Sequence, residues 1–369
     1  MKNSSSSNKP RLLHFVTGGF SGATQVAVDL VEAHRTSGNF IAKLVLRRKR
    51  NTTSERVDAL RQRGLDVDIV AGWSHAITVW QFYKICKCFR PDIVVAHGFS
   101  DHIWARFAAL LAGVPYMVHV EHNSRERYTR WRLAQSLWLT KRTEKIVGCS
   151  EGVRNSLLEL GFPAEKVIAI PNGIRLAPYS NKQIPFAART PGIVMAARFA
   201  RQKDHTTLLH ALALLRQRGL TPPVQLAGGG KKRYREAAQR LSLRLGLQDQ
   251  VQFVGFCNDV PSLLMEHRIC VLASHYEGMP LSLIEGMAAG CAVIGSRVVG
   301  IQEVINDREN GLLADHASAV AMADALEFLL RDDAVGSRLA DQARVDAFNK
   351  YSLECMVQNY EALFSQILN

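Results

Sequence analysis

Short apolar runs alternate with longer segments of helical period along the chain. Each run is bounded by Gly, Pro or polar residues, which is typical of strands buried in a parallel sheet. Helical segments follow several of these runs, so the order of elements predicts an α/β architecture. The clearest strands are predicted over residues 11–17, 41–47, 65–71, 91–98, 113–123, 251–256, 269–274 and 291–296.

The most informative stretch spans residues 269–303. It opens with a buried strand, and Pro280 then suits the first turn of a helix, where its missing N–H costs nothing. Gly290 suits the end of that helix, and a further buried strand follows. The stretch therefore predicts one right-handed βαβ unit. Because ligands of such sheets bind at the carboxyl ends of the strands, the loop 275–279 is a candidate site.

Two carboxylates belong to this candidate site. Glu277 lies on the loop, and Glu285 lies eight residues later in the predicted helix. Gly278 lets a ligand approach the backbone, and the free N–H groups at the start of the helix attract phosphate. Carboxylates beside a phosphate are unfavourable unless they bind hydroxyls, which a ribose and a sugar ring would supply. The alternative is that both are ordinary exposed carboxylates, since two Glu at this spacing are common by chance.

Two cations and a glycine turn follow other predicted strands of the same half. Arg198 and Lys203 come just after a strand that begins at Gly192. Fixed cations at this place suit the charge that develops on a leaving diphosphate, and a solvated basic loop is the alternative. Gly228 and Gly230 form a Gly-x-Gly turn that lacks the Lys-Ser/Thr of a P-loop.

Histidines end two predicted strands of the N-terminal half. His97 either faces a ligand or is a hydrogen-bonded residue of the strand end. His119 and His122 suggest a metal, but no third ligand has suitable spacing, so we expect none. Asp66 and Asp68 imitate a metal-binding DxD pair, yet they alternate with apolar residues as solvent-facing strand positions do.

Composition bounds the class of protein. A chain of 369 residues with 47% hydrophobic residues suggests two domains with real cores. No apolar run approaches a transmembrane length, and no signal peptide is recognised. The seven cysteines include no CxxC pair, which predicts reduced thiols in a cytoplasmic protein.

Positive charge is concentrated in the N-terminal half. The net charge is +13, with 26 Lys and Arg against 14 Asp and Glu in residues 1–180, and 20 against 19 in residues 181–369. The imbalance predicts an anionic partner for that half, either a membrane leaflet or a phosphorylated, lipid-linked acceptor. Nucleic acid is the competing partner, but no helix-turn-helix, RNP or zinc-finger pattern supports it, so we expect none.

Residues 124–142 predict a basic, aromatic helix. Its aromatic residues recur at helical spacing, which suits a helix lying on a membrane interface. A core-packed helix with a solvated basic face explains the pattern equally well. The residues concerned are Tyr128, Trp131 and Trp138, flanked by Arg125, Arg127, Arg130, Arg132, Lys141 and Arg142.

The segment EGMPLSLIE, residues 277–285, resembles the E-x7-E signature of retaining glycosyltransferases of family four. The resemblance extends over about residues 11–366. It implies the GT-B fold, in which two Rossmann-like doubly wound domains face each other across a cleft and a C-terminal helix crosses back. The domains implied are a disordered tail over 1–10, an acceptor-binding domain over 11–180, a nucleotide-sugar-binding domain over 181–350 and a crossover helix over 351–369.

The resemblance also implies a role for each matching residue. Arg198 and Lys203 would stabilise the leaving diphosphate without a metal, Glu277 and His122 would hold the donor sugar, and Glu285 would bind the ribose. The sequence departs from the family pattern where a Gly is usual, at Asp204 and Val299. The remaining donor-binding residues implied are Gly22, Gly228, Gly230, Gly278, Met279, Pro280 and Leu281.

The implied enzyme moves a hexose-type sugar from a nucleoside diphosphate sugar to a glycan or lipid-linked acceptor, as in lipopolysaccharide or other cell-envelope synthesis. We expect it in the cytoplasm, associated peripherally with the inner membrane face. Two rival functions remain: a nucleotide-sugar 2-epimerase of the same fold, and a non-catalytic nucleotide-sugar-binding protein. Base, sugar, acceptor and linkage are not predicted.

Overall fold

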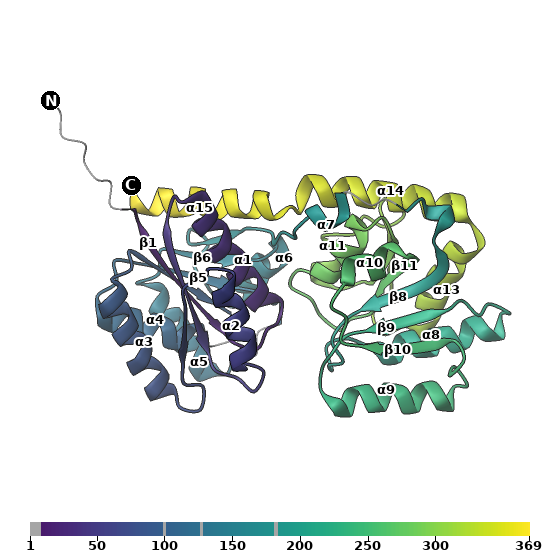
Figure 1. Cartoon of the computed structure of the whole chain (residues 1–369), viewed down its shortest axis with the longest axis horizontal. Coiled ribbons are helices and arrows are strands. Elements are labelled where there is room, and N and C mark those ends of the chain that lie inside the picture. The colour runs from purple at the N-terminus through teal and green to yellow at the C-terminus, as the bar shows by residue number, and fades with distance from the viewer. Residues whose placement is uncertain (1–8, 99–100, 126–127, 181–183) are drawn as a thin grey trace. The chain divides into compact units, whose positions relative to one another are not determined.

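The computed structural model describes residues 9–98, 101–125, 128–180 and 184–369. The chain divides into two compact units, of which unit 1 comprises Met1–Asn172 with Met356–Asn369 and unit 2 comprises Gly173–Cys355. Each unit is built on one parallel sheet with helices on both faces (Figure 1). Residues 1–8 of the tail expected over residues 1–10 lie outside the described residues.

Unit 1 contains a seven-stranded sheet in the order β3-β2-β1-β4-β5-β6-β7. Its strands are β1 (Arg11–Thr17), β2 (Ile41–Arg47), β3 (Val67–Val70), β4 (Ile93–His97), β5 (Tyr116–Glu121), β6 (Lys145–Gly148) and β7 (Val167–Ala169). Its helices are α1 (Gly22–Ser37), α2 (Ser54–Gln62), α3 (His75–Phe89), α4 (His102–Ala112), α5 (Arg130–Thr140), α6 (Glu151–Glu159) and most of α15 (Leu353–Leu368).

Unit 2 contains a six-stranded sheet in the order β10-β9-β8-β11-β12-β13. Its strands are β8 (Thr190–Ala196), β9 (Val224–Ala227), β10 (Val251–Gly255), β11 (His267–Leu272), β12 (Ala292–Ser296) and β13 (Leu312–Ala314). Its helices are α7 (Ala177–Ser180), the 3-10 turn η1 (Phe186–Ala188), α8 (His205–Gln217), α9 (Lys232–Arg244), α10 (Val260–Met265), α11 (Leu281–Ala288), α12 (Val299–Gln302), α13 (Ala319–Arg331) and α14 (Asp333–Lys350).

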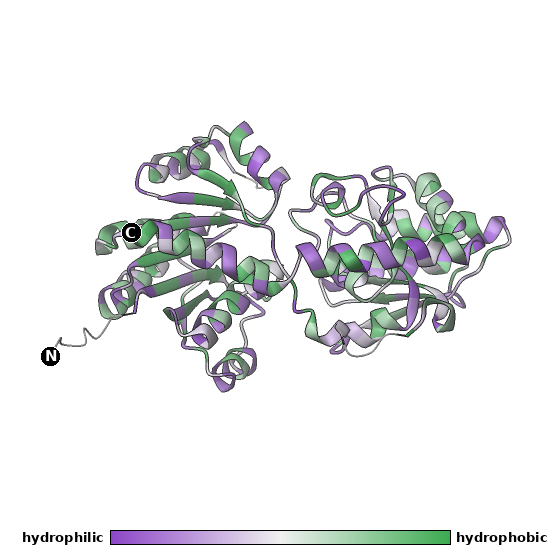
Figure 2. Ribbon diagram, turned by 90° about the horizontal axis from the view of Figure 1, so that it is seen from above, coloured by the Kyte–Doolittle hydropathy of each residue, from purple (hydrophilic) through white to green (hydrophobic). Residues whose placement is uncertain are grey.

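The central strands are apolar because both of their faces are buried. Every residue of β4 and β12 is buried, whereas the covering helices carry both hydrophobic and hydrophilic residues along their lengths (Figure 2). In each sheet the first strand of the chain is central. The next two strands add to one side of it, and the remaining strands add to the other side. The strand order therefore reverses between β1 and β4 in unit 1 and between β8 and β11 in unit 2, and ligands of such sheets bind at these reversal points.

The last helix, α15, returns to unit 1 as expected (Figure 1). Tyr360 and Phe364 are fully buried. The Glu361 carboxylate accepts hydrogen bonds from Ser37 Oγ at 3.0 Å and Asn39 Nδ2 at 2.9 Å, and lies 3.2 Å from His34 Nδ1. Apolar burial and this polar cluster hold the helix against unit 1.

Helix α5 is shorter than the predicted basic helix, since it begins at Arg130. Arg127 lies outside the described residues. Leu139 is fully buried, whereas Trp131 is 73% and Trp138 51% exposed, so the helix has a packed face and an exposed aromatic face. Among the helices of the described residues, none combines the length and apolarity that crossing a bilayer requires.

Candidate active site

The strand reversal of unit 2 brings two of the predicted residues into contact. Lys203 follows β8 and Glu277 follows β11, and these strands are hydrogen-bonded neighbours. Lys203 Nζ donates to Glu277 Oε1 at 2.6 Å, with the two side chains only 12% and 7% exposed. A charge pair of this burial is stable only with further hydrogen bonds.

Two residues that sequence analysis did not identify supply those bonds. Ser274 Oγ donates to Glu277 Oε1 at 2.6 Å, and Gln202 Nε2 lies 3.3 Å from Oε2. Gln202 Nε2 also donates to the carbonyl of Tyr276 at 2.8 Å, which ties the loop after β8 to the loop after β11. Glu277 is therefore a fixed carboxylate, and the interpretation of an ordinary exposed residue is wrong for it.

A glycine also shapes the loop that carries Glu277. A Cβ at Gly300 would collide with the backbone carbonyl of Gly278 and would lie 2.8 Å from that of Glu277. Val299, the departure from the family pattern, is 44% exposed as the first residue of α12. The close approach therefore requires a glycine only at the second position of this turn.

Gly228 and Gly230 allow the ends of β8 and β9 to pack together. Their φ angles are +149° and +136°, and Cβ atoms there would collide with the carbonyls of Ala197 and Phe199. Arg198 lies between those two carbonyls and is exposed. The glycine turn thus fixes the backbone of Arg198 at the same edge of the sheet as Lys203, although no contact joins the two side chains.

The start of α11 differs slightly from the prediction. Gly278, Met279 and Pro280 are buried in the loop, but Pro280 precedes the helix as its N-cap residue, and Leu281 is the first helical residue. Glu285 is half-buried, little more than one turn into the helix.

The aspartate that replaces the usual glycine after Lys203 has a structural role. Asp204 is the N-cap of α8, and its carboxylate accepts from the Thr207 N–H at 3.2 Å and from Thr207 Oγ1 at 2.5 Å. The substitution thus supplies a helix cap beside the charge pair.

The reversal point of unit 1 holds a chain of three histidines. His14 Nδ1 lies 3.1 Å from His97 Nε2, and His97 Nδ1 lies 3.0 Å from His122 Nε2. Burial lowers the pKa of all three, that of His122 to about 4. The rings are therefore neutral at pH 7, and each N–H donates to the next ring, so the tautomer of His97 sets that of His122. His97 is a hydrogen-bonded residue of a strand end, one of the two alternatives considered for it.

Gly22 is the exposed first residue of α1, and Ser21 caps that helix. Like His122, it belongs to unit 1.

Comparison with known families covers nearly the whole of both units. Residues 20–177 match the model "Glycosyltransferase Family 4", and residues 180–346 match "Glycosyl transferases group 1". The chain belongs to the glycosyltransferases. The resemblance to glycosyltransferases of family four is thereby confirmed.

Relatives of the glycosyltransferase are distant but span much of it. The lipopolysaccharide core biosynthesis glycosyltransferase LpsE of Rhizobium meliloti is 27% identical over 227 residues, which are 61% of this chain and 65% of that protein. An Escherichia coli UDP-Gal:alpha-D-GlcNAc-diphosphoundecaprenol alpha-1,3-galactosyltransferase is 26% identical over 299 residues, 76% of this chain and 77% of that one.

Among solved structures, Anabaena HepE in complex with UDP and glucose has a TM-score of 0.84 at 18% identity, and covers 97% of this chain and 100% of its own. The predicted fold class, two Rossmann-like domains of the GT-B type, is confirmed.

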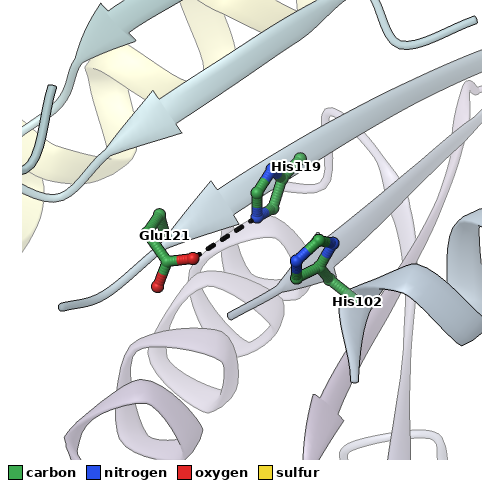
Figure 3. A group of neighbouring side chains, drawn as sticks. All are labelled: His102, His119 and Glu121. Atoms are coloured by element: carbon green, nitrogen blue, oxygen red, sulfur yellow. Dashed lines mark ion pairs between the residues drawn. The ribbon is translucent and has the colours of Figure 1, made fainter. Parts of the chain in front are cut away.

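The glycosyltransferase also contains a buried cluster with metal-ligand chemistry. His102, His119 and Glu121 place one ligand atom each within 4.8 Å of one another (Figure 3). The expectation of no third ligand beside His119 and His122 rested on sequence spacing, whereas His102 is distant from His119 in sequence but adjacent in space. The two imidazoles are stacked, with centroids 3.8 Å apart and planes at 22°. A metal lies in the plane of each imidazole that binds it, so these nearly parallel rings do not aim at one ion.

Proposed function

We propose that the glycosyltransferase moves a hexose-type sugar from a nucleoside diphosphate sugar to a hydroxyl of a glycan or lipid-linked acceptor in cell-envelope polysaccharide synthesis. The buried Lys203–Glu277 pair at the strand reversal of unit 2 carries the proposal. Burying a charge pair costs desolvation free energy. Its presence at a ligand-binding edge of the sheet therefore indicates a functional site. The names of LpsE and of the Escherichia coli galactosyltransferase support the cell-envelope assignment.

The proposed reaction uses the pair in two ways. Glu277, held by Lys203, Ser274 and Gln202, accepts hydrogen bonds from sugar hydroxyls. A lysine ammonium has three N–H donors, so its bond to Glu277 leaves donors for the diphosphate. The bond between the anomeric carbon and the diphosphate oxygen breaks, and Lys203 together with Arg198 stabilises the charge that develops.

Retention of the anomeric configuration is part of the proposal. The acceptor hydroxyl forms the new bond on the face that the diphosphate leaves, and its proton passes to the departing phosphate oxygen. In this scheme the two cations do the work that a divalent metal does in other transferases. The measurements are the anomeric configuration of the product by NMR and the rate with and without EDTA. An inverted product, or loss of activity in EDTA, would contradict this part.

The donor site is tested first by binding. Thermal unfolding midpoints with UDP, GDP, ADP, CMP and NAD should rise for one nucleoside diphosphate, because a ligand that binds only the folded state stabilises it by mass action. Glu285→Ala should abolish that rise if Glu285 binds the ribose. A rise with NAD alone, or with none of the five, would refute the donor assignment.

Turnover then separates the rival functions. A 2-epimerase would convert the donor to an isomer without an acceptor, and a binding protein would give no turnover. The transferase gives a product only when donor and acceptor are both present.

We also propose that unit 1 associates with the cytoplasmic face of an anionic membrane. Four of the five tryptophans are more than half exposed, and all four lie in unit 1: Trp73, Trp80, Trp131 and Trp138. Tryptophan favours the membrane interface, and the basic half supplies the electrostatic attraction. Vesicles with anionic lipid should retain the protein at low salt and release it at high salt. Equal binding to neutral vesicles would contradict the electrostatic part.

A further inference from the structure

A cavity of unit 1 lies at the edge of its sheet where ligands of parallel sheets bind. Its volume is about 410 Å³. Residues from the ends of β1 and β2, from the loops after β2, β3 and β4, from the first turn of α3 and from α5 line it. They are Thr17, Arg47, Lys49, Gly72, Trp73, His75, Asp101 and Arg132.

Positive charge predominates among the residues that line the cavity. They include three cations, Arg47, Lys49 and Arg132, and a single carboxylate, Asp101. Arg47 and Lys49 share that carboxylate, with Lys49 Nζ 3.1 Å from Asp101 Oδ2. The pKa of His75 is lowered by burial and then by the charge of Arg47; Asp101 raises it in part, and smaller contributions from Arg132 and Lys49 lower it further. The electrostatic potential at the cavity is therefore positive, and it disfavours the binding of a further cation.

Arg47 organises the cavity. Its guanidinium is buried, with Nε 3.3 Å from Thr78 Oγ1 and Nη2 donating to His75 Nδ1 at 2.9 Å. Because an arginine N–H only donates, His75 Nδ1 must accept, and the proton of the neutral imidazole lies on Nε2. Stacking against Trp104, at 4.2 Å between ring centroids, fixes the ring. His75 is thus held as a neutral N–H donor.

We propose that this cavity binds the phosphate or diphosphate group of the acceptor, an inference that rests on the proposed function. Lys49, whose side chain is 42% exposed, and Arg132 supply the charge-assisted hydrogen bonds, and His75 supplies a neutral one. Three cations against one carboxylate leave an excess of two positive charges in the lining. A phosphate or diphosphate carries more negative charge than a ligand with a single carboxylate, and it therefore matches this excess better. Trp73, 79% exposed at the cavity, offers an apolar face to the part of the acceptor that adjoins the phosphate.

The test uses tryptophan fluorescence of the full-length chain. All five tryptophans lie in residues 73–138 of unit 1, and Trp73 lines the cavity, so a ligand there changes the emission. Inorganic pyrophosphate is titrated into protein already saturated with the nucleoside diphosphate that stabilises it, so that the donor site is occupied. We expect a saturable change that the double variant Lys49→Gln/Arg132→Gln weakens at least about tenfold.

Arg130→Gln is the matched control, because it removes an exposed cation of the same helix, α5, that does not line the cavity. It should titrate as the unchanged protein does. Thermal unfolding of each variant verifies that unit 1 is folded. No saturable change, or equal titrations for the double variant and the control, would overturn the proposal.

Kinetics distinguish this proposal from the transferase assignment. With a diphosphate-linked acceptor, the double variant should raise the acceptor KM at least about tenfold and leave the donor KM unchanged. Absence of transfer with any acceptor would refute the proposed function. The pyrophosphate titration would still show whether the cavity binds a phosphorylated group. An unchanged acceptor KM, with loss of binding to anionic vesicles that lack the diphosphate lipid, would assign the cavity to a membrane headgroup and overturn the acceptor role.

Discussion

Removing either partner of the Lys203–Glu277 pair should destabilise unit 2 strongly, and removing both should cost less than the sum of the two single losses. Lys203→Met leaves the Glu277 carboxylate charged at 7% side-chain exposure, and Glu277→Gln leaves the Lys203 ammonium at 12%. Breaking a buried pair from one side costs about 3–5 kcal/mol, because the remaining charge has no compensation. Since Ser274 and Gln202 still offer hydrogen bonds to position 277, we expect the low end of that range, about 3 kcal/mol for each single variant.

The double variant Lys203→Met/Glu277→Gln contains neither of the two buried charges of the pair. The methionine fills the volume of the lysine stem, and the amide oxygen of the glutamine still accepts from Ser274 Oγ. Its loss of stability should therefore be about 2 kcal/mol or more smaller than the sum of the two single losses. An exposed pair of the same unit serves as the control: Lys232 Nζ lies 3.7 Å from Glu236 Oε1, with side chains 89% and 44% exposed. Lys232→Met should cost less than about 0.5 kcal/mol.

Urea unfolding measures these differences, with two signals that separate the units. Tryptophan emission reports unit 1, since unit 2 contains no tryptophan, and hydrogen exchange of peptides from β8 and β11 reports unit 2. The single variants should accelerate exchange in β8 and β11 and leave the tryptophan transition in place. Single losses below about 1 kcal/mol, or a double variant as unstable as the sum of its parts, would show that the pair is not energetically coupled.

Three further predictions concern other parts of the molecule. Gly228→Ala should abolish nucleotide binding, because its Cβ would collide with the Ala197 carbonyl, whereas Gly229→Ala, with its nearest neighbour at 3.9 Å, should bind normally by calorimetry. Unit 1 should lose about 1 kcal/mol per buried histidine between pH 6.5 and 5.5, since folding keeps imidazoles such as His122, with its pKa of about 4, neutral while the unfolded chain takes up protons. A tryptophan-monitored stability that stays flat over this range would contradict it. Phe256→Ala, which removes a ring 68% exposed after β10, should weaken binding of the nucleoside diphosphate more than that of pyrophosphate, and equal weakening would exclude a contact with the base.

Sequence analysis predicted what depends on neighbours along the chain. Apolar runs identify strands because both faces of a parallel sheet are buried, and the segment that resembles the family, residues 277–285, spans only a loop and the start of one helix. The N-cap of α6 is equally local, since Ser150 Oγ accepts from the Val153 N–H at 3.2 Å. Each of these signals is local.

What the sequence did not predict depends on the order of strands in space. His14 and His97 are 83 residues apart and meet only because β1 and β4 are neighbours. Arg47 and Asp101, which are 54 residues apart, likewise form an ion pair between segments distant in sequence. A search for polar residues at the carboxyl ends of several apolar runs, combined with the strand order of a doubly wound sheet, would have placed His97, Arg47 and Asp101 at one edge; His14 lies in the middle of β1 and would not have been found.

The two sheets have chemically different residues at their strand-reversal points. In a doubly wound sheet the crossover connections leave the reversal point in opposite directions, which opens a crevice at the carboxyl ends of two central strands, where ligands bind. Unit 2 places a charged pair there, Lys203 and Glu277, and unit 1 places neutral histidines that burial keeps unprotonated. A charged pair suits a ligand whose charge changes during reaction, such as a diphosphate that is leaving. Neutral donors and acceptors suit hydroxyls, whose charge does not change on binding, and this division is the one expected if unit 2 binds the donor and unit 1 the acceptor.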